Sequence, residues 1–370
     1  MKKSLFILPL LMVSALAGCN GGSKGPNLAE QALDSFPMLI DFATGKELNI
    51  VEDKQTAKDL DMFLGLKSLY WQETEFDLTW TPAPAEKWVV SEYKQDESRT
   101  KFRPIYGAEA FDCSLQLDIQ TKDGKQKATA TWSFEAQVHK ALDLTDYTYI
   151  TIEDLSKGFV DTGKPTSGKY YVVGYIHAHM EEPDHVYSGV YLGDGQYGTQ
   201  LYAGQLSKLW SSYGFADGDL VIAAGTVSPY KGLMEIKPDA MEPVLEKDYP
   251  NVKKPVVLNG NELSWGTNDK GETSAKYHQC APVEITVSYV SGKVESESAQ
   301  GDLVFKTSDN KTINVSCNYH IGKTAMASLM ELTANIQVGD TYKLRGVISV
   351  YDDAPNIIPI NGAASFTKVA

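Results

Sequence analysis

Alternation of apolar and polar residues dominates the chain and predicts a protein built mainly of β-strands. Runs with a period of two recur, and Asp-Gly, Asn-Gly, Gly-Asp and Lys-Gly pairs, which favour tight turns, separate them. Three segments show instead the period of an amphipathic helix, and they lie at 56–70, 205–213 and 324–334. We therefore expect a mainly β fold with a few short helices.

The first folded segment is expected to be a small β-sandwich over residues 41–140. Phe76, Leu78 and Trp80 alternate with polar residues and share one face of a strand. Further on, alternating apolar residues at 115–119 lead into Asp123-Gly124, and a second alternating run at 128–138 leads out of it. Two such runs around an Asp-Gly pair indicate a β-hairpin with an apolar inner face.

This segment resembles the immunoglobulin-like modules of bacterial surface proteins. The resemblance rests on a strand that ends in Trp80, a variable stretch, and then the pair Arg103-Pro104. The stretch from Thr81 to Thr100 is longer than the compact pattern of these modules, so the strand register there is open. The resemblance implies that the module is a spacer and that Trp80 and Trp132 belong to its core.

An internal repeat follows the sandwich. Residues 218–238 and 339–359 align without a gap at an offset of 121, and seven of the 21 positions are identical. The identical positions include Gly225 and Gly346, where a strand is expected to bend, and Tyr230 and Tyr351, which stand beside a short turn. A repeat of this length indicates a duplicated domain rather than a solenoid.

Each copy of the repeat resembles an OB-fold barrel, because three strands, a helix and two strands are expected in that order. The expected upstream strands lie at 169–179, 187–192 and 199–203 in the first copy and at 283–294, 301–307 and 312–317 in the second. We expect the first barrel within residues 141–248 and the second within 249–370. The predicted fold class is therefore mainly β, with an immunoglobulin-like β-sandwich followed by two duplicated OB-fold-like barrels.

The OB resemblance implies a ligand face on strands two and three, and tyrosines gather there in the first barrel. The candidate ligand-binding residues are Tyr171, Tyr175, Tyr187, Tyr191 and Tyr202. The chain carries 34 basic and 48 acidic residues, a formal net charge of −14, and four acidic residues lie close to these tyrosines. A negative surface repels a phosphate backbone, so nucleic acid is disfavoured and a glycan, a peptide or a protein partner fits better. Any one of these tyrosines can instead have its ring in the core.

The N-terminus has the pattern of an export signal. Lys2 and Lys3 precede an apolar run over 5–15, and Leu16-Ala17-Gly18-Cys19 follows it. This resembles the bacterial lipobox, which implies that residues 1–18 are removed and that Cys19 carries lipid. The apolar run is too short to span a bilayer. Residues 19–40 are then expected to be a lipid-anchored tether, and the rest to lie outside the cytoplasm, at an outer membrane or a cell surface.

One segment suggests a metal site. His177 and His179 stand two residues apart on an expected strand, so they share a face, and a turn could bring His185 back to them. Three imidazoles with an open position would suit Zn²⁺ or Cu²⁺ and even hydrolysis. Pairs of this kind are also common on exposed strands, and the sequence assigns no partner that would orient the rings.

Two further motifs have structural interpretations. Gly193-Asp-Gly195-Gln-Tyr-Gly198 matches a nucleotide-binding string, but a strand rather than a helix follows it, so it is expected to be a hairpin turn. Cys280 and Cys317 lie in one domain of an exported chain and are candidates for a disulfide, with Cys113 left as a buried apolar residue.

These observations favour a non-catalytic, monomeric, lipid-anchored surface protein that binds an extracellular glycan, peptide or protein through OB-type modules. No cofactor is expected under this hypothesis. The alternatives are a metal-binding protein or metal-dependent hydrolase that uses His177, His179 and His185, and an extracellular nucleic-acid-binding protein. No nucleophile elbow, His-Glu-x-x-His motif or phosphate-binding loop stands out in the sequence, which lowers the expectation of an enzyme.

Overall fold

We analysed a computed structural model of the chain. It describes residues 27–42, 45–48, 55–57, 62–93, 98–104, 110–136, 142–162, 168–180, 189–213, 215–244, 246–298 and 300–369. Cys19, His185 and Tyr187 lie outside these ranges.

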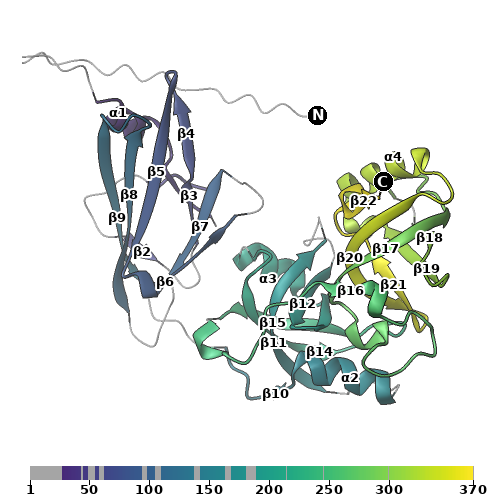
Figure 1. The fold of residues 1–370 in the computed structure, drawn as a ribbon. Coiled ribbons are helices and arrows are strands. Elements are labelled where there is room, and N and C mark those ends of the chain that lie inside the picture. The colour runs from purple at the N-terminus through teal and green to yellow at the C-terminus, as the bar shows by residue number, and fades with distance from the viewer. Residues whose placement is uncertain are drawn as a thin grey trace, which may run out of the picture.

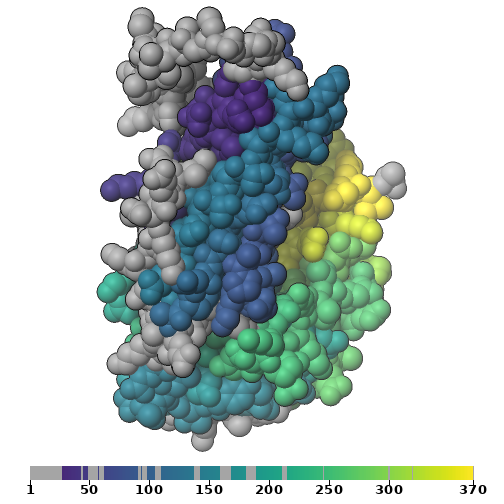
Figure 2. Space-filling view, turned by 90° about the vertical axis from the view of Figure 1, so that its left-hand side faces the viewer, coloured from purple at the N-terminus to yellow at the C-terminus, as the bar shows by residue number. Residues whose placement is uncertain are grey.

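The chain folds into three β bodies that follow one another along the sequence (Figure 1). A two-sheet sandwich comes first and two barrels follow. Viewed from the side of the sandwich, its strands lie in front of the barrels (Figure 2). The predicted fold class, mainly β with an immunoglobulin-like sandwich and two OB-fold-like barrels, is confirmed. Within the described ranges, no helix is both long enough and apolar enough to cross a membrane.

The sandwich pairs a four-stranded sheet, in the order β1-β3-β7-β6, with a five-stranded sheet, in the order β2-β9-β8-β5-β4. Its elements are α1 (Leu28–Ser35), β1 (Leu39–Asp41), β2 (Gln55–Ala57), β3 (Phe63–Leu66), β4 (Ser68–Trp71), β5 (Thr74–Ala83), η1 (Ala85–Lys87), β6 (Trp88–Glu92), β7 (Arg99–Pro104), β8 (Phe111–Thr121) and β9 (Lys127–Ala136). The predicted hairpin around Asp123-Gly124 is β8 and β9. The ring of Trp80 lies 5.4 Å from those of Phe102 and Trp132, so both tryptophans belong to the core as predicted.

Two sequence predictions fail in this region. The helix expected over 56–70 is wrong, because β2, β3 and β4 occupy its described part. Strand β3 lies between β1 and β7 with three consecutive buried residues, and a short apolar run of this kind cannot be distinguished from a helix by its period. The tether expected over 19–40 is also wrong from Asn27 onward. Asn27 caps helix α1, which buries Ala29 and Ala32 on the sandwich core.

The first barrel has the strand connectivity of an OB fold. Its elements are β10 (Thr148–Tyr149), α2 (Ile152–Thr162), β11 (Lys169–His179), β12 (Gly189–Asp194), β13 (Tyr197–Tyr202), α3 (Leu206–Tyr213), β14 (Leu220–Val227) and β15 (Glu235–Pro243). The sheet runs β11-β12-β13-β15-β14 and closes because β14 pairs again with β11. Helix α3 connects the third and fourth barrel strands, where the sequence predicted a helix.

The second barrel repeats this connectivity. Its strands are β16 (Leu258–Asn259), β17 (Pro282–Ser291), β18 (Gln300–Lys306), β19 (Thr312–Asn318), β20 (Thr341–Tyr351), β21 (Ala354–Ile358) and β22 (Phe366–Lys368), and its helix is α4 (Lys323–Asn335). The 3-10 turns η2 (Glu246–Asp248), η3 (Gly260–Glu262), η4 (Ala275–His278), η5 (Tyr319–Ile321) and η6 (Gly362–Ser365) complete the path. Strand β20 pairs with both β21 and β17, so this barrel closes as the first one does.

The two repeated glycines allow the same close approach in both barrels. A Cβ at Gly225 would lie 2.1 Å from the carbonyl oxygen of Lys237 on β15, and one at Gly346 would lie 2.5 Å from that of Ile358 on β21. Both separations are too short for a methyl group. The sequence identity at this pair therefore follows from a steric requirement that the duplicated barrels share.

A buried ion pair joins the sandwich to the first barrel. Nζ of Lys101, on β7, lies 2.9 Å from Oδ2 of Asp219, which immediately precedes β14. Their side chains are 1% and 7% exposed. Burial lowers the pKa of Lys101, whereas the charge of Asp219 opposes that shift. Each charge compensates the other away from water, so the contact strongly favours one arrangement of the two bodies.

The segment between the barrels lies along the β12–β13 turn. The backbone N–H of Lys253 donates to Asp194 at 2.7 Å, and that of Gly195 donates to the carbonyl of Lys253 at 3.0 Å. A Cβ at Gly193 would lie 2.7 Å from Pro255. The glycine string is a hairpin turn, as predicted, and its glycines leave room for the connecting segment.

Replacing Lys101 tests the ion pair. We expect Lys101→Met to lower the free energy of unfolding by about 3 kcal/mol, because it leaves the Asp219 carboxylate buried without its counter-charge. Lys122→Met is the matched control, since Lys122 forms an exposed, solvent-screened pair with Asp77 and the substitution should leave stability close to that of the wild type. Urea denaturation measures both. Equal effects of the two substitutions would contradict the assignment.

Candidate functional site

A cleft of about 690 Å³ lies between the two barrels. Strand β11 of the first barrel forms one wall, and β20 and α4 of the second barrel form the other. Its floor contains small apolar side chains such as Ala178, Val347 and Ala364. Its polar lining consists of His177, His179, Asp217, Thr324, Ser328, Arg345 and Asn361. A concave site with a few polar groups over an apolar floor is typical of ligand binding.

His177 is held by the second barrel as a neutral ring. Its Nε2 lies 2.8 Å from the carbonyl oxygen of Cys280, and because that oxygen can only accept, Nε2 carries the proton. Burial lowers the pKa of His177 to about 4, so the ring is uncharged at neutral pH. Its Nδ1 is buried and has no hydrogen-bond partner among the described residues. The ring therefore carries an unpaired acceptor that is buried beside the cleft rather than open to it.

His179 lies on the same strand and is oriented by a carboxylate. Its Nδ1 lies 2.8 Å from Oδ1 of Asp217, and its ring centroid is 5.0 Å from that of Trp210. With Nδ1 committed to Asp217, Nε2 is the nitrogen left for a ligand. His177 and His179 do line one cavity, as the strand alternation predicts, with a β-bulge between Ile176 and Ala178.

The metal hypothesis rests on a third ligand. His185 lies outside the described residues, so its position relative to His177 and His179 stays a prediction. In the ranges that the structure describes, no three His, Cys, Asp or Glu side chains form a group that could hold a metal ion. Asp217 and the carbonyl of Cys280 each occupy one nitrogen of the two histidines. The described side chains do not by themselves form a site for Zn²⁺ or Cu²⁺, so binding of either ion stays a prediction.

The predicted tyrosine face is wrong for two of its members. Tyr191 is 0% exposed and packs with Cys280 and Val347 of the second barrel. Tyr175 is buried where the connecting segment packs against β11. The ring of Tyr171 lies 5.2 Å from that of Tyr149 in a tilted arrangement, and Tyr171 and Tyr202 are both half-buried. Tyr187 lies outside the described residues. The connecting segment and the second barrel cover Tyr175 and Tyr191, so these two side chains are not open to a ligand.

The predicted disulfide between Cys280 and Cys317 is absent. Both are buried free thiols, and Cys113 is buried in the sandwich core. Cys280 belongs to the apolar cluster between the barrels, whereas Cys317 packs inside the second barrel, so the two sulfur atoms face different cores. Burial raises the pKa of Cys317 to about 12 and that of Cys280 well above its usual value, which keeps both thiols protonated.

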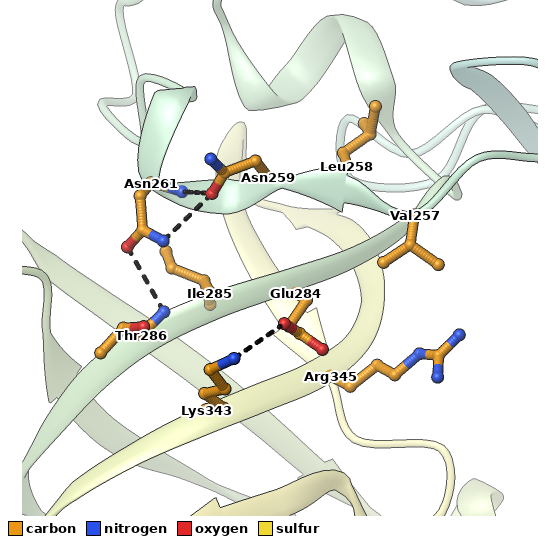
Figure 3. Close-up of a pocket in the computed structure, with 9 residues that line it drawn as sticks. All are labelled: Val257, Leu258, Asn259, Asn261, Glu284, Ile285, Thr286, Lys343 and Arg345. Atoms are coloured by element: carbon orange, nitrogen blue, oxygen red, sulfur yellow. Dashed lines mark hydrogen bonds and ion pairs between the residues drawn. The ribbon is translucent and has the colours of Figure 1, made fainter. Parts of the chain in front are cut away.

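A second cavity, of about 600 Å³, adjoins the cleft on the second barrel (Figure 3). Asn259, Asn261, Glu284, Thr286 and Lys343 supply its polar groups. Asn261 accepts from the backbone N–H of Thr286 at 3.3 Å, and Lys343 lies 3.8 Å from Glu284. Figure 3 shows the guanidinium of Arg345 extending away from that pair.

Arg345 lines both cavities and is the site residue that the sequence reasoning missed. The chain has only three arginines, and the other two, Arg99 and Arg103, lie in the sandwich. Arg345 is exposed, and its side chain makes no hydrogen bond or ion pair with the described part of the chain. The repeat could have pointed to Arg345. The first copy has Ala224 at the equivalent position, so the shared fold does not require an arginine there.

A buried carboxylic acid lies where the two barrels meet. Glu235, at the start of β15, is 5% exposed, and burial raises its pKa to about 7. Its charge influences the buried Tyr191 hydroxyl and the Cys280 thiol. Gln279 Nε2 and Tyr191 Oη are buried here without hydrogen-bond partners among the described residues. The junction between the barrels is therefore closely packed, and its buried polar atoms are not exposed to solvent.

Comparison with known proteins adds weak likenesses to solved structures. No family model matches the chain, and no curated protein matches it. A protein assigned as an aspartyl-tRNA synthetase from Leishmania major Friedlin is 12% identical, with 34% of this chain and 26% of that chain covered at a TM-score of 0.21. This chain thus spans about a quarter of that protein.

Two further structures cover more of the chain. Drosophila Unr CSD456 is 11% identical over 82% of this chain and 94% of that one, at a TM-score of 0.16. A chain described as "Molecular basis for abrogation of activation of pro-inflammatory cytokines" is 10% identical over 55% of this chain and 93% of that one, at a TM-score of 0.25. Likenesses this weak carry no argument about function.

Glu235 predicts a pH dependence of stability. Its folded pKa of about 7 lies above the ordinary value of 4.5, so the folded state retains a proton that the unfolded chain releases. The free energy of unfolding should therefore fall as pH rises from 4.5 through 7, by up to about 3 kcal/mol. Glu235→Gln should match the wild type near pH 4.5 and exceed it at pH 8, as measured by urea denaturation.

Glu86→Gln is the control, because Glu86 is exposed on the sandwich. Its stability should follow that of the wild type across the whole pH range. If Glu235→Gln showed the same pH profile as the wild type, Glu235 would not be the protonated group at the junction.

Proposed function

We propose that this chain is a lipid-anchored, extracytoplasmic binding protein whose paired barrels hold an acidic glycan in the cleft between them. The observation that carries the proposal is Arg345, the one arginine of the barrel region, which is exposed to both cavities without a partner in the described chain. A guanidinium matches the fork of a carboxylate, such as that of a uronic acid.

The rest of the cleft suits a sugar. Pyranose rings have apolar faces and hydroxyl edges, and the cleft combines an apolar floor with Asn361 and the two oriented histidines. OB folds are known to accept oligosaccharides or oligonucleotides. Arg345 and the neighbouring Lys343 are too few cations for a phosphate backbone, which carries one charge per nucleotide, whereas one guanidinium suffices for a single carboxylate, which favours the glycan.

The lining favours binding over catalysis. Ser328, the serine of the cleft, donates to the carbonyl of Ala325 at 2.7 Å and accepts from the N–H of Ala363 at 2.9 Å. Its hydroxyl thus stabilises the contact between α4 and η6 and is not poised as a nucleophile. The hydrogen-bonded pair of His179 and Asp217 can hold a ligand by a hydrogen bond as readily as it can transfer a proton.

The N-terminal sequence supports the anchoring part of the proposal. Cys19 stands at the cleavage position of a lipobox-like segment, and two or three acyl chains there would hold the chain stably at a membrane. Asn20 follows it rather than the Asp that retains many lipoproteins at the inner membrane. We place the protein at an outer membrane or cell surface.

Replacing Cys19 tests the anchor. The wild type expressed in a bacterial host should carry acyl chains on the mature N-terminus and partition into the detergent phase of Triton X-114. Cys19→Ser should lack acylation by intact mass and partition into the aqueous phase. Gly22→Ala, in the adjacent segment, is the control and should behave as the wild type. An unacylated wild type would refute lipid anchoring and leave the cleft proposal standing.

Replacing Arg345 tests the ligand. On an array that pairs uronate-containing oligosaccharides with their carboxyl-reduced forms, we expect binding only to the acidic members. Arg345→Gln should weaken that binding by roughly tenfold or more, because it removes a charge-assisted, bidentate contact. Lys306→Gln, which removes an exposed cation from β18 of the same barrel, should leave binding unchanged.

Three results would count against the glycan. These are binding to no glycan, equal binding to the carboxyl-reduced sugars, and preferential binding to peptides or oligonucleotides on parallel arrays. Retention of binding by Arg345→Gln would move the ligand away from the cleft.

A further inference from the structure

The hairpins that close the two barrels meet at equivalent positions of the repeat. Tyr230 precedes the turn between β14 and β15, and Tyr351 precedes the turn between β20 and β21, 121 residues later. Their ring centroids lie 6.3 Å apart in an edge-to-face arrangement. The two tyrosines thus form one aromatic pair from opposite barrels.

Both rings remain open to solvent although they contact each other. Tyr230 is 54% exposed and Tyr351 is 52% exposed, and neither hydroxyl makes a hydrogen bond within the described residues. Among the described aromatic residues of the barrels, Tyr149, Tyr230 and Tyr351 are the exposed ones, and Tyr230 and Tyr351 are the two of these whose rings contact each other. An exposed aromatic surface of this kind is typical of a recognition site.

The backbone holds the pair in place. Lys231-Gly232 and Asp352-Asp353 are two-residue turns in which both residues have positive φ, which is the tight hairpin geometry. The hairpins also touch each other, since Nζ of Lys231 lies 2.7 Å from Asp352 and 5.3 Å from the Tyr351 ring centroid. The two hairpins therefore lose little conformational entropy when a ligand binds to the rings.

We propose that Tyr230 and Tyr351 form a second, neutral-sugar site, separate from the cleft. The C–H groups of a pyranose face carry partial positive charge and pack on the negative faces of aromatic rings. The charged side chains beside the rings, Lys231, Asp352 and Asp353, can exchange hydrogen bonds with sugar hydroxyls. Two carboxylates at this position repel a phosphate backbone, which disfavours stacked nucleotides.

A protein partner fits this surface less well than a sugar. A stable protein interface covers about 800 Å² on each partner and has an apolar centre. Here the aromatic surface is two rings wide and charged residues follow each ring immediately. The size and composition match one or two sugar units.

Titration of neutral tetrasaccharides tests the site. Maltotetraose, cellotetraose, mannotetraose and xylotetraose are added to the full-length ectodomain, and sugar proton shifts are followed by NMR. We expect at least one of them to show the upfield shifts that aromatic ring currents cause. The double substitution Tyr230→Ala with Tyr351→Ala should weaken this binding by roughly tenfold or more.

Matched variants separate this site from folding effects and from the cleft. Replacing both tyrosines by phenylalanine keeps the rings and should retain binding within about threefold. Tyr70→Ala removes a tyrosine that is 72% exposed on the sandwich and should leave the shifts unchanged. Arg345→Gln should retain them too, so failure of the cleft proposal and failure of this one give different results. The site is refuted if no tetrasaccharide shifts, or if the shifts survive loss of both rings.

Discussion

The close approach of Cys280 to Gly198 is the contact on which the two-barrel unit depends. A Cβ at Gly198 would lie 2.5 Å from the carbonyl carbon and oxygen of Cys280, so only glycine lets the second barrel approach this far. The same carbonyl accepts from His177 of the first barrel, while the N–H of Cys280 donates to Ile348 of the second. One peptide segment is thereby tied to both barrels. The cleft exists because this contact determines where its two walls stand.

Local pattern was sufficient to predict most strands but not the helix at 56–70. Strand β11 has the bounds that the sequence predicted, 169–179, and Gly225 and Gly346 mark the same steric contact in both copies. The helix failed because β3 is covered on both faces, which removes the period-two signal that distinguishes a strand. The cleft is a different matter. Its walls come from β11 and β20, which are far apart in sequence, and no local pattern indicates that they face each other.

The tyrosines show why exposure is hard to infer from an amphipathic strand. Tyr175 and Tyr191 stand on the barrel surface that a single OB domain would leave open. In this chain the connecting segment and the second barrel cover them. Sequence alternation predicts which side chains point out of the barrel. It does not tell whether these side chains contact solvent or another domain. The sequence did not single out Arg345, because a lone charged residue on a strand is typical of ordinary protein surface.

The contact between the equivalent hairpins joins corresponding residues, Tyr230 with Tyr351 and Lys231 with Asp352, as a two-fold axis between two identical copies would. In a dimer of identical barrels, a residue on such an axis meets its own copy, so a lysine there would face a lysine and an aspartate would face an aspartate. Covalent linkage of the copies lets the two sides differ, and Lys231 meets Asp352 instead. Tyr230 and Tyr351 have kept identical side chains at this contact. A tandem duplication can thus place complementary charges at a contact between equivalent positions, which a two-fold dimer of identical subunits cannot do on its axis.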